Sequence, residues 1–145
     1  MLNKEEGRNG SNKLRLYRLF KQDYCTEVYI NSNMPRSYRS ALAKFRCGVA
    51  PIRIETGRYE KLLLENRKCF NCNEVEDEIH VLFHCVLYDY IRESLFNECI
   101  VKCPTFLEKS DADKLCFLFS KPDLCFNLAK ICFLILTRRK HLLYC

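Results

Sequence analysis

Four residues in the middle of the chain have the types and the spacing of a metal site. Cys69, Cys72, His80 and Cys85 stand in the order C-x2-C-x7-H-x4-C. Two thiolates separated by two residues can bind one ion from a single tight turn, and a His followed five residues later by a Cys can complete a tetrahedron from the next element. Zinc prefers this set of sulfur and nitrogen ligands, and with all four positions filled by protein atoms the predicted site is structural rather than catalytic.

His84 offers an alternative fourth ligand. His80 and His84 are four residues apart and share one face of an α-helix, whereas His80 and Cys85 share a face only if the helix loosens or ends near the metal. We favour Cys85, because thiolate is the softer and stronger zinc ligand and its spacing lies within the zinc-finger range. The remaining alternative is that none of these residues binds a metal.

The elements around the ligands follow from an acidic run. Residues 74–78 contain four carboxylates, which suit the N-terminus of a helix because the backbone dipole favours negative charge there. We therefore expect Cys69 and Cys72 on a turn, or on a short β-hairpin, and His80 in the first turns of a helix. The predicted metal site occupies residues 66–86.

Length and composition favour one small domain whose core is helped by the metal. The chain has 145 residues and 11 cysteines. Its first thirty residues lack the apolar stretch of a secretory signal, so we expect an intracellular protein with reduced thiols. Residues 1–12 are polar and predict a disordered lead, followed by a single zinc-stabilised domain over residues 13–145. Four cysteines among apolar residues are expected to pack in its core: Cys99, Cys116, Cys125 and Cys132.

The predicted fold class is mainly α. Pro35 and Gly48 bracket a helix over residues 35–47, and Ser110 with Asp113 resembles a capping box for the helix that follows. Residues 49–58, which contain a Pro and a Gly, read as a connector. The other expected helices, each from apolar spacing, cover residues 13–22, from about 80 or 86 to 101, 110–119, and from 120 to about 142.

Positive charge is concentrated before the metal site. Residues 36–68 hold nine Lys or Arg against three Glu, which suggests a polyanionic partner. On a helical wheel, Arg36, Arg39 and Arg46 cluster beside the apolar stripe of their helix, an arrangement that suits phosphate. The alternative is a plain solvated face.

The last helix carries an apolar run over residues 131–136. Lys130 precedes it and three cations follow from Arg138, so the run falls well short of the roughly 20 residues that a membrane span needs. We expect a core helix and no membrane contact. Its apolar circumference is broad, which leaves room for a protein partner at this C-terminal helix.

Three stretches together resemble a known family. They are residues 42–59, which include ETGRY, the metal window, and LYDYIRESLF at residues 87–96. The chain resembles the zinc-binding region that follows the reverse transcriptase of non-long-terminal-repeat (LINE-like) retrotransposons, here as a stand-alone chain. The resemblance implies zinc on Cys69, Cys72, His80 and Cys85, and contact with RNA or DNA through basic side chains upstream of the metal, Arg58 among them. Prolines that family members often carry before the first ligand pair and after the last Cys are absent here.

Catalysis is not expected. A polymerase needs a pair of metal-binding aspartates, and Tyr88-Asp89-Tyr90 supplies one. Pro122-Asp123 looks like the start of an endonuclease site, but no acidic residue follows Asp123 to complete it. The sequence therefore predicts a non-catalytic zinc module that binds nucleic acid through phosphate contacts, or alternatively a zinc-structured scaffold for protein partners.

Overall fold

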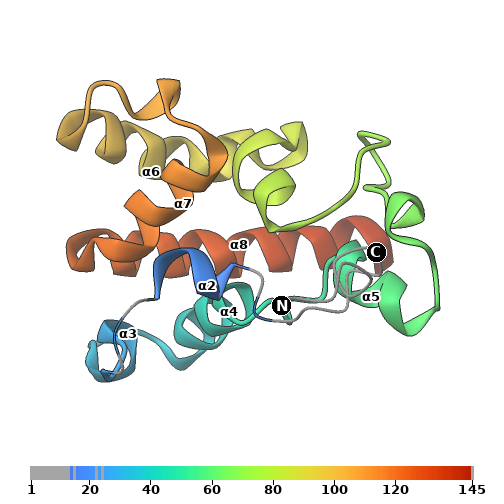
Figure 1. The fold of residues 1–145 in the computed structure, drawn as a ribbon, viewed down its shortest axis with the longest axis horizontal. Coiled ribbons are helices and arrows are strands. Elements are labelled where there is room, and N and C mark those ends of the chain that lie inside the picture. The colour runs from blue at the N-terminus through green and yellow to red at the C-terminus, as the bar shows by residue number, and fades with distance from the viewer. Residues whose placement is uncertain (1–13, 15, 22, 24, 145) are drawn as a thin grey trace, which may run out of the picture.

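The fold is assembled around one long C-terminal helix. The computed structural model describes residues 14, 16–21, 23 and 25–144; the predicted lead over residues 1–12 lies outside them. Helix α8 (Cys125–Tyr144) runs through the middle of the molecule, with α6 and α7 above it and α2, α3 and α4 below it in the view of Figure 1. These elements span Tyr17–Phe20 (α2), Val28–Asn31 (α3), Arg36–Arg46 (α4), Asp89–Lys102 (α6) and Asp111–Ser120 (α7).

The remaining elements are short. Helix α5 (Arg53–Tyr59) lies beside the C-terminal end of α8 (Figure 1). Within the described part of the chain no strand is formed, which confirms the mainly α fold class. Single helical turns connect the longer helices at Leu64–Asn66 (η1), His80–His84 (η2), Val86–Tyr88 (η3), Phe106–Glu108 (η4) and Pro122–Leu124 (η5).

Helix α4 begins and ends where its sequence predicts. Pro35 precedes the first turn, and Gly48 adopts a φ of 68°, which a side chain would disfavour. The Gly48 N–H bonds the Phe45 carbonyl at 3.3 Å and the Val49 N–H bonds the Lys44 carbonyl at 2.9 Å. This pair of bonds is a Schellman motif, so the C-terminal carbonyls of α4 are satisfied locally.

The broad apolar circumference of α8 is used inside the chain. Its most extensive packing partner is α4, and α6, α7 and η5 contact its other sides. Cys132 is fully buried within α8, and Cys99 of α6 is equally buried, as expected for thiols that pack as small hydrophobes. Cys116 and Cys125 are partly buried. A protein partner at this helix stays a prediction.

Three local expectations differ from the structure. Residues 49–58 are not a connector, because they contain most of α5, and within the expected helix at residues 13–22 the described helical turn is α2 alone. The helix expected from residue 120 starts later: η5 covers residues 122–124 and α8 begins at Cys125, while the Ser120 hydroxyl donates to the Phe117 carbonyl. Of the two starts expected for the helix that ends near residue 101, the later one is confirmed, since η3 begins at Val86 and leads into α6, and residues 80–84 form the separate turn η2.

Candidate metal centre

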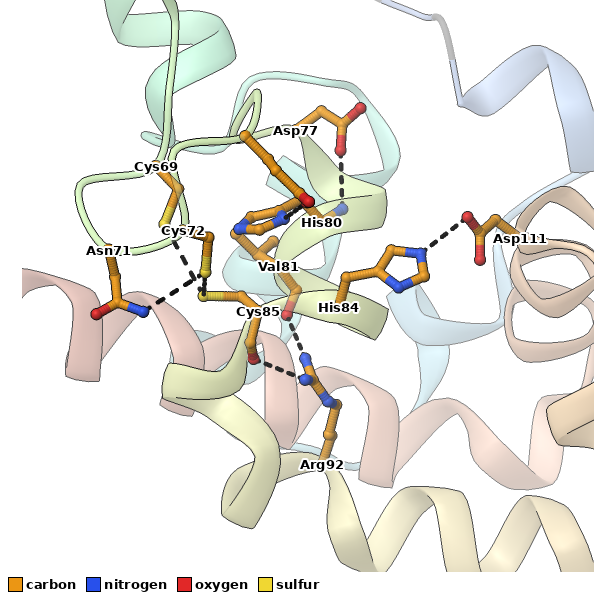
Figure 2. Close-up of polar contacts among 11 residues, drawn as sticks. Cys69, Asn71, Cys72, Asp77, His80, Val81, His84, Cys85, Arg92 and Asp111 are labelled. Atoms are coloured by element: carbon orange, nitrogen blue, oxygen red, sulfur yellow. Dashed lines mark hydrogen bonds and ion pairs between the residues drawn. The ribbon is translucent and has the colours of Figure 1, made fainter.

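The four predicted ligands converge on one point. The ligand atoms of Cys69, Cys72, His80 and Cys85 all lie within 4.8 Å of one another (Figure 2). The Sγ atom of Cys85 is 3.9 Å from that of Cys69 and 3.7 Å from that of Cys72. Zn–S bonds of about 2.3 Å in a tetrahedron place sulfurs about 3.8 Å apart. The spacing therefore fits a single tetrahedral ion.

A tight reversal of the chain supplies the first two ligands. Lys68 and Val75 form an antiparallel bridge, and the Cys69 N–H donates to the Glu74 carbonyl at 2.7 Å. Asn73 takes a positive φ of 56° inside the loop, a conformation that Asn tolerates better than most residues. The expected turn is thus a minimal hairpin with one bridge, and both of its thiols point toward the sulfur of Cys85 (Figure 2).

A π turn supplies the last two ligands. The Cys85 N–H donates to the His80 carbonyl at 2.7 Å, five residues back, where an α-helix would pair residues four apart. The wider turn brings residues five apart to the same side, and turns of this kind are frequent at functional sites. Asp77 Oδ1 accepts from the His80 N–H at 2.8 Å and caps the start of this helical segment. The helix therefore loosens next to the cluster, as coordination by Cys85 would require.

The imidazole of His80 is oriented for coordination. Its Nε2 is buried without a hydrogen-bond partner in the described structure and points toward the sulfurs, while Nδ1 lies 3.5 Å from Glu74 Oε2 (Figure 2). A buried nitrogen lacking a partner carries a desolvation penalty that a metal bond would remove. His84 points away from the cluster, and its Nε2 is 2.9 Å from Asp111 Oδ2. The geometry favours Cys85 over His84 as the fourth ligand.

The electrostatics of the three thiols differ. Burial, reinforced by the neighbouring sulfurs of Cys69 and Cys72, raises the pKa of the Cys85 thiol to about 12. Burial also acts to raise the pKa of the Cys72 thiol, but hydrogen bonds from Asn71 and Cys85 outweigh it and lower that pKa. A divalent cation at the centre would favour the thiolate form of each, because its charge offsets both burial and mutual repulsion.

Arg92 of α6 fixes the end of the π turn, a role that the sequence analysis missed. Its buried guanidinium donates to the Val81 carbonyl at 3.1 Å and to the Cys85 carbonyl at 2.6 Å, and it also pairs with Asp89. These carbonyls belong to the end of a helical turn, where partners within the helix run out. Arg92 thus holds the backbone of a ligand residue from a separate helix.

A buried ion pair joins the metal segment, which we define as residues 66–86, to α8. Oε1 of Glu76 accepts from Nη2 of Arg139 at 2.7 Å and from the Arg53 backbone N–H at 2.6 Å. The Ile54 N–H bonds the Glu76 carbonyl at 2.9 Å. Glu76 therefore caps α5 from 23 residues away, which explains why local sequence signals did not predict this helix. The burial of Arg139, in contrast, could have been predicted, since this residue continues the apolar spacing of Leu128, Cys132 and Ile135.

Gly57 allows α5 to approach the metal segment closely. A Cβ at this position would lie 2.6 Å from Cγ of Arg67. The Arg67 guanidinium is buried and donates to the Leu62 and Ile54 carbonyls. Close packing against Arg67 therefore explains why a glycine stands at this position of the ETGRY stretch.

The expected arginine face is corrected in part. Arg46 is 5% exposed, pairs with Glu27 at 2.7 Å and packs over aromatic rings, so the expectation that it joins a solvent-facing phosphate site is wrong. Its position next to the apolar stripe places it under α2 and α3, whose packing a helical wheel cannot show. Arg39 donates to the Ile30 and Met34 carbonyls, and Arg58 pairs with Glu55 at 2.8 Å. Arg36 is exposed.

Three comparisons with known proteins bear on the identity of this chain, and the lengths of its helices bear on membrane contact. No family model matches it, and no curated protein or solved structure gives a significant match. The retrotransposon resemblance therefore stays a prediction that depends on the residues quoted for it. Among the helices of the described residues, none combines the length and the apolar character needed to cross a membrane.

Proposed function

We propose that this chain is a zinc-structured helical module, related to the region that follows retrotransposon reverse transcriptases, that binds RNA or DNA and has no catalysis of its own. The observation that carries the proposal is the Cys69, Cys72, His80 and Cys85 cluster within 4.8 Å. Three thiolates and one imidazole fill a tetrahedron and leave no position for substrate. The role of the metal is then structural: it stabilises the fold.

Zinc is the ion that this ligand set favours. Thiolates and an imidazole in tetrahedral geometry suit Zn²⁺, whereas Mg²⁺ and Ca²⁺ prefer oxygen ligands. Metal analysis of the purified protein should find one zinc per chain. Cys85→Ala should lower zinc affinity by well over tenfold, because it removes a direct ligand, and His84→Ala should leave it nearly unchanged. The reverse ranking would establish the two-histidine site.

Phosphate contact is supported by cations that lack an acidic partner. Arg36, Lys44 and Lys68 are exposed and form no ion pair with a carboxylate in the part of the chain described, whereas Arg46 and Arg58 do. Cations in this state can exchange their counterions for phosphates, which makes affinity fall steeply with salt. A salt titration of binding to unlabelled competitor RNA and DNA tests the proposal, and no measurable binding at low salt would refute it.

A second candidate, a scaffold for protein partners, is supported by one surface. A shallow hollow of about 550 Å³ on α6 is lined by the apolar side chains of Phe83, Phe96, Ile100 and Leu107, by the exposed Tyr90, and by Asp89, Arg92, Glu93 and Asn97. Surfaces that combine apolar side chains with polar ones in this way occur at protein interfaces. In this case, capture of a protein partner would be insensitive to salt and would be lost with Ile100→Asp, a change that leaves the exposed cations in place.

A further inference from the structure

A groove runs between α4, α5 and the last turns of α8. Its first part has a volume of about 430 Å³ and an apolar floor that includes Ala41, Phe133 and Leu136. Hydroxyl groups and lysines surround this floor. They come from all three helices: Ser37, Ser40, Lys44, Thr56, Thr137 and Lys140.

The charge of this first part is one-sided. Lys44 of α4 and Lys140 of α8 are exposed, and neither pairs with a carboxylate among the described residues. Among the residues that the structure describes, no Asp or Glu side chain lines this part. Arg139 also borders it, but its guanidinium is engaged by Glu76. The two lysines therefore supply the net positive charge that a ligand would meet.

The groove continues to the metal segment. A second hollow of about 260 Å³ shares Thr56, Arg139 and Tyr144 with the first and extends to Lys68 and Phe70. Tyr144 is 78% exposed and Phe70 is 50% exposed. Of the described residues that line this second hollow, Glu60 alone carries a carboxylate, and it forms two 2.8 Å bonds with Arg53. Cations and aromatic rings thus follow one another along a continuous path.

We propose that this groove binds single-stranded nucleic acid, with phosphates on Lys44, Lys140 and Lys68 and unpaired bases against Tyr144 and Phe70. The inference rests on the proposed function and names its surface and its ligand class. A positively charged groove with exposed aromatic rings is the general form of a single-strand site, since every base has a face that can stack. In a duplex the bases are stacked inside the helix, so they cannot stack on these rings.

The metal cluster builds one wall of the groove. Lys68 and Phe70 flank the ligand Cys69 directly in sequence, so the hairpin that holds the metal also sets where their side chains project. Glu76 then fixes Arg139 at the point where the two hollows meet. Single-strand binding should therefore require the metal, because chelation would release this wall.

The test compares two triple variants of equal charge. Lys44→Gln, Lys68→Gln and Lys140→Gln remove the groove cations; Lys109→Gln, Lys114→Gln and Lys121→Gln remove three from the region of α7 as a matched control. Zinc-loaded proteins are titrated with a fluorescent 20-nucleotide oligo(dT), and with a hairpin duplex, over a range of salt. The groove variant should lose affinity and flatten the salt slope by about two units, since a single-strand phosphate contact contributes about 0.7. Tyr144→Ala should weaken binding by about tenfold without changing the slope.

Each of the following outcomes would contradict a different part of the proposal. If the parent protein binds neither these oligonucleotides nor the RNA of the salt titration above, both the proposed function and this inference fail. If the parent binds but the two triple variants behave alike, nucleic-acid binding stands and the groove is the wrong surface. Tighter binding to the duplex would overturn the single-strand class. Equal displacement of oligo(dT) by polyglutamate at matched charge would identify a general anion site instead.

Discussion

The two halves of α8 are held in place by different forces. Leu128, Ile131 and Cys132 in the first half are fully buried against other apolar side chains. In the second half, Arg139 is buried against the carboxylate of Glu76, beside the metal segment. Apolar packing tolerates small changes, because many weak contacts share the energy. A buried ion pair and a metal site fail when any one partner is removed, so the second half is conditional on a distant segment.

The largest expected effect comes from removing the metal. A zinc chelator should abolish the hydrogen-exchange protection of residues 66–96, because binding free energy at a structural zinc site is folding free energy, about 10–16 kcal/mol in small zinc domains. Protection in α4 and in the first half of α8 should persist, since apolar burial there does not involve the metal. Exchange mass spectrometry with and without chelator measures this difference. Equal loss of protection everywhere would show that the two halves fold as one unit.

Breaking the buried ion pair should have the next largest effect. Glu76→Gln leaves the Arg139 guanidinium buried without a compensating charge and should lower the free energy of unfolding by about 3–5 kcal/mol. Urea denaturation of the zinc-loaded protein measures it. Glu93→Gln, an exposed change on α6, is the charge-matched control and should stay within about 0.5 kcal/mol. Ile131→Val in the first half of α8 should cost about 1 kcal/mol; a larger loss there than at Glu76 would reverse the comparison.

Crowding the contact between α5 and Arg67 sharpens the same contrast. Gly57→Ala places a Cβ 2.6 Å from Cγ of Arg67, whose guanidinium cannot shift freely because two carbonyls hold it. We expect a loss of about 1–3 kcal/mol in unfolding free energy, although Ala is the better helix former. Thr56→Ala, one residue earlier in the same helix, serves as the control. Stabilisation by Gly57→Ala would show that Arg67 is free to move.

The smallest effect is expected at the local cap of α7, a helix whose Asp111 contacts His84 of the metal segment. Ser110 Oγ accepts from the Asp113 N–H at 3.2 Å at the start of α7. Ser110→Ala should cost about 1 kcal/mol, and the cost should be the same with and without chelator. Ser94 lies at an exposed position inside α6, where it caps no helix end, so Ser94→Ala should leave the free energy of unfolding unchanged. A chelator-dependent cost at Ser110 would mean that α7 depends on the metal segment.

Local signals determined much of this fold. Pro35 and Gly48 set the limits of α4, and Ser110 sets the start of α7, because each acts on backbone groups within four residues of itself. The candidate metal ligands could also be predicted from the sequence, since few combinations of residue type and spacing suit a metal site. Ligand strength alone favoured Cys85 over His84. Only the structure, however, shows the π turn that places Cys85 on the same side as His80.

Tertiary partners decided the rest. Helix α5 forms where the sequence suggested a connector, because Glu76 caps it from another segment. Arg46 is buried although its helix position suggested solvent, because Glu27 and the aromatic rings of α2 and α3 cover it. A helical wheel orders residues on one helix only, and spacing along the chain carries no information on which distant carboxylate or ring will arrive. The sequence thus specified the candidate metal ligands, while the packing of distant segments specified which cations lack a carboxylate partner among the described residues.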